Sequence, residues 1–222
     1  MTVPYGIKLV AFDLDGTLVD DTIYVWKTLH EHFGSDPERR AKARSDYMAG
    51  RITYEQWFNI DLELLSQKGA TKDSILSCFS GLRPAPGAME LLRELKKRGF
   101  ILALISGSLD ILLERFFPSG TFDHVMINHL EFDEEGFITG GQHTPFDLEG
   151  KALGLANLAR KRGLTLSQCA FVGDNVNDVH VMKAAGFSVC VHPKHPDAKR
   201  AADMVLEGRE LSPLLEIFGW PE

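Results

Sequence analysis

Short apolar runs alternate along the chain with longer segments in which apolar positions recur at helical spacing. Residues 7–12 and 100–105 have the length and the β-branched content of buried strands. Residues 87–98 show the periodicity of an amphipathic helix, and Gly99 follows as a common helix terminator. Strands that alternate with helical segments in this way indicate βαβ units and a parallel sheet.

The same alternation continues through the second half of the chain. We predict further strands over residues 124–127, 170–172, 188–191 and 204–206, and helices over residues 109–116, 151–162, 179–185 and 211–218. Residues 131–141 interrupt the alternation, because two short runs on either side of Glu135 and Gly136 indicate a peripheral, solvated β-hairpin. The predicted fold class is therefore α/β, with a doubly wound Rossmann-like parallel sheet.

Residues 21–85 have a different composition from the rest of the chain. Their apolar positions follow helical spacing throughout, and no run among them suits a buried strand. We expect a small all-helical cap with Trp26, Trp57 and Phe58 in its own core. A chain of 222 residues accommodates such an insertion beside one main domain. The predicted domains are a core made of residues 1–20 and 86–222 and a cap made of residues 21–85.

Charge and composition narrow the range of functions. The net charge of −7 lacks the basic footprint of sequence-independent nucleic-acid binding, so we expect no nucleic-acid partner. No stretch approaches the ~18 uninterrupted apolar residues of a membrane span, and residues 1–16 contain no signal-peptide core. The three cysteines lie far apart, which suits a reducing compartment. We expect a cytoplasmic protein, either a monomer or a homodimer.

Polar groups that can carry chemistry occur where four of the predicted elements begin or end. DLDGT at residues 13–17, SGS at 106–108 and GDNVND at 173–178 follow predicted strands, and Lys151 begins a predicted helix. Each feature alone is common in turns, in calcium-type loops or on solvated surfaces. In open α/β sheets, however, the ligand crevice lies beyond the carboxyl ends of the strands. The fold would therefore bring all four together.

These groups suit phosphate chemistry. Several carboxylates in one crevice repel one another unless a cation neutralises them, and oxygen ligands without Cys or His suit Mg²⁺. The Ser106 hydroxyl and the Lys151 ammonium are typical partners of phosphate oxygens. An aspartate can attack phosphorus, and a second aspartate two residues on can move the protons, as Asp13 and Asp15 would allow.

The four motifs, in this order over nearly the whole chain, resemble the haloacid dehalogenase superfamily of phosphohydrolases, and its phosphoserine phosphatase group in particular. The resemblance implies a Rossmann-like core with an inserted helical cap of the C1 type, and Mg²⁺ as cofactor. It implies that Asp13 is the nucleophile and Asp15 the general acid/base, and that the phosphate is bound by Ser106, Gly107, Lys151 and Asn177. It also implies that Mg²⁺ is held by the side chains of Asp13 and Asp174 and by the Asp15 carbonyl, and that Asp178 orients Lys151 or a metal-bound water.

The cap departs from the pattern of the phosphoserine phosphatases. Where that group has a Glu for the substrate's amino group and an Arg for its carboxylate, this chain has Thr22 and Asp61. Met48 and Tyr54 fall at substrate-facing places, and Arg51 is a candidate for the missing positive charge. The changes weaken the case for phosphoserine, because a pocket reads a zwitterion through such charge pairs. Asp61 either faces a cationic group or is a solvated helix charge, and we favour the solvated charge.

We therefore expect a Mg²⁺-dependent hydrolase of a small phosphomonoester that acts through an aspartyl-phosphate intermediate. The alternatives are a phosphatase for a phosphorylated amine or sugar, and a phosphomutase of the same superfamily. A receiver-type domain, in which a phosphorylated Asp acts as a switch, needs neither a second Asp nor a cap. An inactive binding module is disfavoured by the intact set of Asp13, Asp15, Ser106, Lys151 and Asp174.

Overall fold

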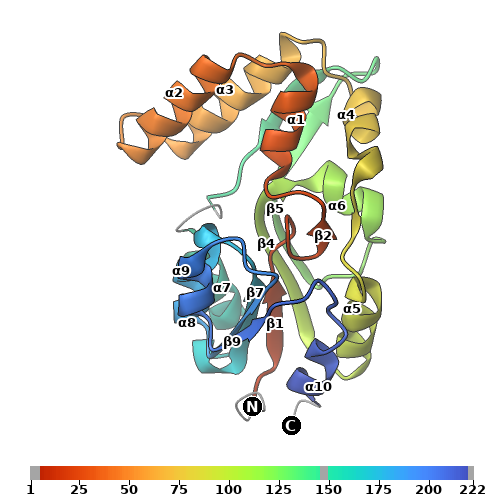
Figure 1. Ribbon diagram of the computed structural model, residues 1–222, viewed down its shortest axis with the longest axis vertical. Helices are drawn as coiled ribbons and strands as arrows, with labels where there is room; N and C mark the ends of the chain where they lie inside the picture. Colours follow the sequence, from red (N-terminus) through yellow and green to blue (C-terminus); the bar gives the residue numbers. More distant parts are fainter. Residues whose placement is uncertain (1–5, 146–149, 220–222) are drawn as a thin grey trace.

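The main sheet is a parallel α/β sheet with one antiparallel edge strand (Figure 1). The computed structural model describes residues 6–145 and 150–219, so the predicted core residues 1–5, 146–149 and 220–222 lie outside the described residues. The strand order is β6-β5-β4-β1-β7-β8-β9, and only the β5–β6 pair is antiparallel. The strands are β1 (Leu9–Phe12), β4 (Ile101–Leu109), β5 (His124–Phe132), β6 (Ile138–Gln142), β7 (Cys169–Gly173), β8 (Phe187–Val191) and β9 (Met204–Leu206).

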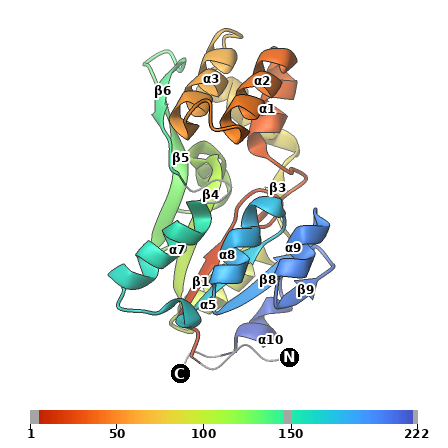
Figure 2. The ribbon, with the colours of Figure 1, turned by 90° about the vertical axis from the view of Figure 1, so that its left-hand side faces the viewer.

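Helices cover both faces of this sheet, which confirms the doubly wound arrangement (Figures 1 and 2). One face carries α5 (Ala88–Lys97), α6 (Asp110–Phe116) and α10 (Leu214–Phe218), and the other carries α7 (Gly150–Lys161), α8 (Val179–Ala184) and α9 (Pro196–Ala201). Alternate residues of β1 join the two cores: Val10 and Phe12 pack on the first face, Leu9 and Ala11 on the second. Burial on both faces explains why β1 is apolar without alternation.

Four helices lie together above the carboxyl ends of the central strands (Figure 1). They are α1 (Val25–Phe33), α2 (Pro37–Met48), α3 (Tyr54–Ser66) and α4 (Lys72–Cys78), and we call them the cap helices. The short antiparallel pair β2 (Val19–Asp20) and β3 (Arg83–Pro84) flanks them in the chain, with the 3-10 turn η1 (Phe79–Gly81) before β3. We propose that residues 21–85 form the cap and the remaining residues the core.

Local signals explain where the cap helices begin. The Asp36 side chain accepts hydrogen bonds from the backbone N–H groups of Glu38 and Arg39, and Pro37 occupies the first turn of α2. A reciprocal capping box starts α3 at Thr53 and Gln56. In the described ranges, none of the helices combines the length and the apolar character needed to cross a membrane.

The predicted hairpin forms at the edge of the sheet, and it also contacts the cap helices. Strand β5 runs on to Phe132 and pairs with β6, so the hairpin extends from the sheet to the cap helices (Figure 2). At its tip the Gly136 carbonyl accepts a hydrogen bond from the Lys72 N–H of α4 at 2.8 Å. A Cβ on Gly141 would lie 2.9 Å from the Phe58 ring of α3. The hairpin therefore supports the cap from the side of the core.

Two 3-10 turns complete the described elements of the core. The turn η2 (Leu166–Gln168) precedes β7, and η3 (Val176–Asp178) follows it within the fourth motif. The side chain of Asn175 accepts a hydrogen bond from the Val176 N–H at 2.8 Å and starts η3. This tight turn holds the acidic residues of the motif close to the end of β7.

Candidate active site

Strand β1 carries the first candidate residue to the edge of the sheet. Asp13 follows Phe12 directly, and its N–H donates to the Val172 carbonyl at 3.0 Å, which extends the β1–β7 pairing by one residue. The β1–β4 register brings β4 past Ile105 to Ser106 at the same edge. Because β1 lies between β4 and β7, the crevice beyond its end is the switch point at which open α/β sheets bind ligands.

Lys151, in the first turn of α7, is fully buried between two carboxylates. Its Nζ lies 2.8 Å from Oδ1 of Asp13 and donates a hydrogen bond to Oδ1 of Asp178 at 2.7 Å. Burial by itself disfavours the ammonium form, but the two carboxylates outweigh burial and raise the pKa of Lys151 above its ordinary value. Lys151 therefore stays cationic beside Asp13.

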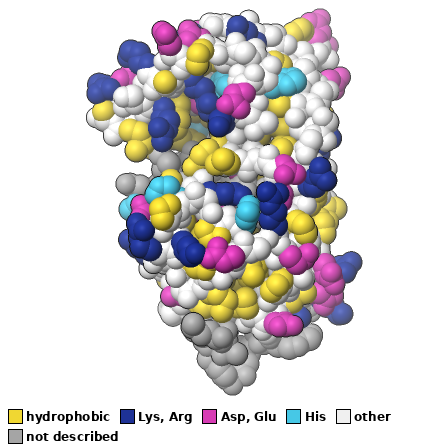
Figure 3. Space-filling view, in the orientation of Figure 1, with side chains coloured by type: hydrophobic (Ala, Val, Ile, Leu, Met, Phe, Trp, Pro, Cys, Tyr) yellow, Lys and Arg dark blue, Asp and Glu magenta, His cyan; other side chains and the backbone are white. Residues whose placement is uncertain are grey.

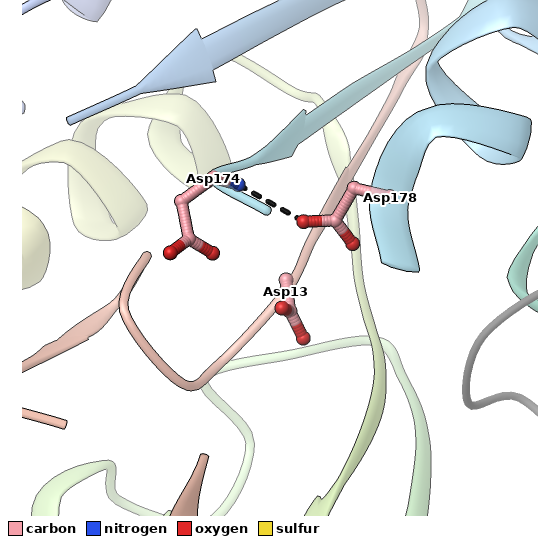
Figure 4. Close-up of side chains that lie close together, drawn as sticks. All are labelled: Asp13, Asp174 and Asp178. Atoms are coloured by element: carbon pink, nitrogen blue, oxygen red, sulfur yellow. Dashed lines mark hydrogen bonds between the residues drawn. The ribbon is translucent and has the colours of Figure 1, made fainter. Parts of the chain in front are cut away.

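Asp13, Asp174 and Asp178 form a buried acidic cluster (Figure 4). One carboxylate oxygen of each residue lies within 4.8 Å of those of the other two. Burial, reinforced by the neighbouring carboxylates, raises the pKa of Asp174 well above its ordinary value. Burial also raises the pKa of Asp178 to about 6. The single positive charge of Lys151 does not balance three carboxylates, so the cluster favours a bound cation.

The cluster offers carboxylate oxygens that can coordinate a divalent cation. Oδ2 of Asp174 is buried and has no hydrogen-bond partner among the described residues, whereas its Oδ1 accepts from Thr17 Oγ1 at 3.0 Å. A Cβ on Gly16 would lie 2.3 Å from that unpaired Oδ2, and Gly16 has a φ of +76°. Glycine at this position is required by conformation and by space. Hard cations prefer such carboxylate oxygens, so the residues fit a divalent metal ion.

Asp15 lies outside this cluster and has different partners. Its Oδ1 accepts from Ser108 Oγ at 2.7 Å, and its Oδ2 accepts from the Val25 N–H at the start of α1 at 2.6 Å. Burial raises the pKa of Asp15 to about 7, and the nearby Asp13 charge acts in the same direction. Its carboxyl group can therefore exchange a proton near neutral pH, as a general acid/base must.

The other predicted phosphate ligands are buried at the same edge. Ser106 lies within β4, where β4 continues to Leu109 with a register irregularity, and not after the strand as predicted. The Gly107 carbonyl accepts hydrogen bonds from Trp26 Nε1 at 3.0 Å and from Asn128 Nδ2 at 2.7 Å. It is thus engaged by protein groups. Asn177 is buried, and its Oδ1 lacks a partner among the described residues.

A small pocket of about 120 Å³ lies between the cap helices and the core. Its aromatic lining is Tyr24, Trp26, Tyr54, Trp57 and Phe58. The pocket borders the chemical site, because Tyr24 Oη accepts from Asn175 Nδ2 at 3.0 Å and Trp26 bonds the Gly107 carbonyl. The prediction that the cap aromatics form only a cap core is therefore wrong in part. The pocket is a candidate site for a substrate's leaving group.

The four cap residues that were predicted to face the substrate lie in different environments in the structure. Tyr54 lines the pocket and accepts a hydrogen bond from Asn128 Nδ2 at 3.2 Å. Met48 does not line it, because it lies at the end of α2 with 62% of its surface exposed. Thr22 is buried and shares a hydrogen bond with Thr28, Oγ1 to Oγ1, at 3.0 Å.

Asp61 corrects the expectation of a solvated helix charge. It is buried and lines the pocket. Its Oδ1 lies 3.1 Å from His30 Nε2 and 3.7 Å from Arg40 Nε. Arg51, the candidate for the missing positive charge, is on the surface instead, where it bonds Asp46 at 2.7 Å. The cations of the pocket are Arg40 and Arg44 of α2.

Sequence reasoning missed these arginines and also Ser108. Arg40 and Arg44 lie four residues apart, which places them on one face of α2. That spacing could have indicated a pair of arginines acting together. A helix rich in charged residues, however, is usually solvated. Ser108 stands two residues after Ser106 on the same strand, so its side chain emerges on the same face in regular β-structure. The β4 irregularity made that inference unsafe.

Three comparisons with known proteins agree with this geometry. The model of the haloacid dehalogenase-like hydrolases matches residues 7–186. The phosphoserine phosphatase of Methanocaldococcus jannaschii is 30% identical over 219 residues, covering 94% of this chain and 96% of that protein. The phosphoserine phosphatase of Streptococcus thermophilus is 32% identical over 190 residues, covering 83% and 85%. A solved substrate-bound phosphoserine phosphatase superposes with a TM-score of 0.74 at 26% identity, covering 96% and 99%.

Proposed function

Because the chain belongs to the haloacid dehalogenase-like hydrolases, we propose that it is a phosphatase that cleaves a small phosphomonoester through an aspartyl-phosphate intermediate. One observation carries the proposal: two buried aspartates, two residues apart, lie in opposite environments. Asp13 faces the Lys151 ammonium, whereas Asp15 is held by neutral donors and has a pKa near 7. The first environment suits a nucleophile and the second a proton carrier.

In the first step a carboxylate oxygen of Asp13 attacks phosphorus, and the bond from phosphorus to the leaving oxygen breaks. Asp15 donates its proton to that oxygen, so the leaving group departs as an alcohol. Lys151 and Ser106 would hold the phosphoryl oxygens, and Asp178 positions Lys151 through the 2.7 Å hydrogen bond. In this step Asp15 acts as an acid.

In the second step a water molecule attacks the phosphorus of the aspartyl-phosphate. Asp15, now a carboxylate, takes the proton of that water, and the bond to Asp13 breaks to release inorganic phosphate. The roles of Asp15 alternate, which a group with a pKa near neutrality performs best. The cap helices would limit the access of bulk water during both steps.

We propose Mg²⁺ as the cation of the site, held by the side chains of Asp13 and Asp174 and by the Asp15 carbonyl. The unpaired Asp174 Oδ2 and the clustered carboxylate oxygens support this assignment. When bound, the ion neutralises charge on the phosphoryl group and the carboxylates. Asp178 accepts backbone hydrogen bonds from Asp174 and from the next residue, so it keeps the loop in place.

Phosphoserine is the substrate to test first, because the relatives that align with most of the chain are phosphoserine phosphatases. We also propose a cytoplasmic location. Cys78, Cys169 and Cys190 are all free thiols, and the last two are buried. Free thiols of this kind suit a reducing compartment.

The test is phosphate release by the purified protein with MgCl₂ from a panel of phosphorylated metabolites that includes phosphoserine. We expect Asp13→Asn to lower kcat by roughly 1000-fold or more, because the carboxamide is a near-isostere but a poor nucleophile. Asp73→Asn, an exposed aspartate of α4, is the matched control and should retain activity. Full activity in Asp13→Asn would remove Asp13 from the role of nucleophile. Product analysis with a hexose phosphate separates hydrolysis from phosphoryl transfer to a sugar.

A further inference from the structure

The lining of the cap pocket, as far as the structure describes the chain, contains two cations and one acid. Arg44 is exposed at the pocket and forms no ion pair or hydrogen bond with any residue in the described ranges. Arg40, one helical turn before it, is partly buried, and its only ion pair among those residues is with Asp61 at 3.7 Å. Basic side chains on the exposed surface of the cap are visible in Figure 3. The pocket thus offers guanidinium donors that the protein leaves largely unused.

Among the described residues Asp61 is the one acid that lines the pocket, and it already lies beside basic side chains. Asp61 Oδ1 lies against both Arg40 and His30, and His30 Nδ1 is within 2.9 Å of Ser35 Oγ. This arrangement fixes Asp61 inside the cap, where the Arg40 charge compensates it. An ammonium group entering the pocket would meet an acid already paired with an arginine, and two positive charges. The pocket therefore disfavours a cationic leaving group.

The rest of the lining is consistent with recognition of an anion. The aromatic rings of Trp26 and Trp57 supply apolar walls, and such walls strengthen a charge-assisted hydrogen bond by excluding water. A guanidinium matches the planar fork of a carboxylate and can bind both of its oxygens. The volume of about 120 Å³ limits the leaving group to a small molecule.

We propose that Arg40 and Arg44 select phosphomonoesters whose leaving group ends in a carboxylate. An amino group on the same molecule does not contribute to recognition. Asp61 is a positioning residue that holds Arg40 at the pocket. This inference rests on the proposed phosphatase function and specifies its substrate class as the phosphate esters of small hydroxy acids. Phosphoserine belongs to this class through its carboxylate, whereas phosphorylated amines without a carboxylate do not.

Three esters of matched length test the proposal by their kcat/KM values with MgCl₂. Phosphoserine carries both charged groups, 3-phosphooxypropanoate carries only the carboxylate, and phosphoethanolamine carries only the ammonium. We expect the first two to agree within about threefold and phosphoethanolamine to be poorer by roughly 10- to 100-fold, the effect of losing charge-assisted hydrogen bonds. p-Nitrophenyl phosphate, which has neither a carboxylate nor an ammonium group, reports whether the protein is a phosphatase at all.

Arginine variants connect the preference to the pocket. In Arg44→Gln and Arg40→Gln we expect the ratio of kcat/KM for 3-phosphooxypropanoate to that for phosphoethanolamine to fall by about 10-fold or more. Arg44→Lys should restore part of the ratio, because it keeps the charge but not the planar fork. Arg39→Gln is the matched control, since Arg39 lies on the same helix, pairs with Glu63 and does not line the pocket. Its ratio should match that of the wild type, and circular dichroism checks the fold of each variant.

The outcomes separate this inference from the proposed function. Equal or better turnover of phosphoethanolamine than of phosphoserine would overturn the carboxylate preference. A kcat/KM value for 3-phosphooxypropanoate more than about 10-fold below that for phosphoserine would also overturn the proposal, because the protein would then have a group that binds the ammonium. An unchanged ratio in both Arg40→Gln and Arg44→Gln would remove the arginines from recognition. No hydrolysis of any ester, including p-nitrophenyl phosphate, would instead refute the phosphatase function itself.

Discussion

Asp13 and Asp15 show how one residue type acquires two roles within three positions. The Lys151 ammonium lies 2.8 Å from Oδ1 of Asp13, so a positive charge stands beside this carboxylate. Asp15 is buried and accepts hydrogen bonds from one hydroxyl and one backbone N–H, and burial raises its pKa to about 7. The Ser108 hydroxyl is one of the groups that lower the pKa of Asp15 against the effect of burial.

Replacing Ser108 should shift the pH dependence of catalysis. Asp15 must be protonated for the first step, so kcat/KM should decrease as the pH rises above the pKa of Asp15. The Ser108 hydroxyl donates to the Asp15 carboxylate and lowers its pKa; without that bond the pKa rises and the descending limb moves to higher pH. For Ser108→Ala we expect a movement of roughly one pH unit. Profiles of kcat/KM against pH for the wild type and the variant measure it.

Ser108→Thr is the control for this prediction, because it keeps a hydroxyl on the same carbon. Its descending limb should stay close to that of the wild type. A Ser108→Ala profile that coincides with the wild type over the whole pH range would show that this hydrogen bond does not set the proton affinity of Asp15.

The positions of the four motifs could be predicted from the sequence because the ends of parallel strands converge at one edge of the sheet. The positions of the cap-pocket residues could not be predicted in this way. The positions of Asp13, Ser106 and Asp174 follow from where apolar runs stop, and that of Lys151 from where a helix begins. Arg40 belongs to a helix whose sequence, PERRAKARSDYM, has no apolar stripe to indicate which side is buried. Only the packing of α2 against α3 places that arginine at the pocket.

Among the helices and strands, β5 differs most in length from the element predicted from the sequence. Residues 124–127 were the predicted strand, but β5 continues to Phe132 and forms one arm of the hairpin. The apolar content falls after Ile127 because the outer part of the strand pairs with β6 alone, at the sheet edge. Periodicity identifies a strand by its buried side chains, so it misses the length that backbone pairing adds.

The two glycines of β6 provide a test of the contact between hairpin and cap. A Cβ on Gly141 would lie 2.5 Å from the His129 carbonyl and 2.9 Å from the Phe58 ring, both firmly held. A Cβ on Gly140 would meet only the end of the flexible Glu131 side chain, at 3.3 Å. We expect Gly141→Ala to lower the free energy of unfolding by about 1–3 kcal/mol and Gly140→Ala to change it by less than about 0.5 kcal/mol.

Urea unfolding of both variants at one pH measures this difference. Because the hairpin touches α3, Gly141→Ala should also raise KM for carboxylate esters through the displaced pocket wall. Equal stabilities of the two variants would mean that β6 and α3 adjust to each other without strain, and that the hairpin does not fix the position of the cap.

For the whole molecule, the parallel sheet and the inserted helices followed from the sequence because each element buries a distinct apolar surface. Separate clusters cover the two faces of the sheet, and both were visible as apolar runs and stripes. The orientation of the cap helices over the core depends on contacts between distant residues, such as the hydrogen bonds of Tyr24 with Asn175 and of Trp26 with Gly107, and the packing of Phe58 against β6. Pairs of this kind leave no periodic signal.

The net charge of −7 includes a buried acidic site that opposes folding at neutral pH. In the folded protein the pKa values of Asp15 and Asp178 are raised from 3.8 to about 7 and about 6, and that of Asp174 is raised as well. The folded state therefore binds more protons than the unfolded state between about pH 4 and pH 7. Through these groups, the free energy of unfolding decreases as the pH rises across that window.

A divalent cation should offset part of this loss, because it replaces the proton on Asp174, one of its proposed ligands. We expect MgCl₂ to raise Tm more at pH 7.5 than at pH 5, by roughly 5–10 °C at a concentration about 100 times Kd. Asp174→Asn removes one buried charge and one ligand, so without metal it should be more stable than the wild type at pH 7.5 and should not respond to MgCl₂. Asp73→Asn, exposed on α4, should respond as the wild type does. Thermal unfolding with and without MgCl₂ at both pH values tests whether the cation binds at Asp174. An equal increase in Tm at the two pH values, or an increase that persists in Asp174→Asn, would place the cation elsewhere.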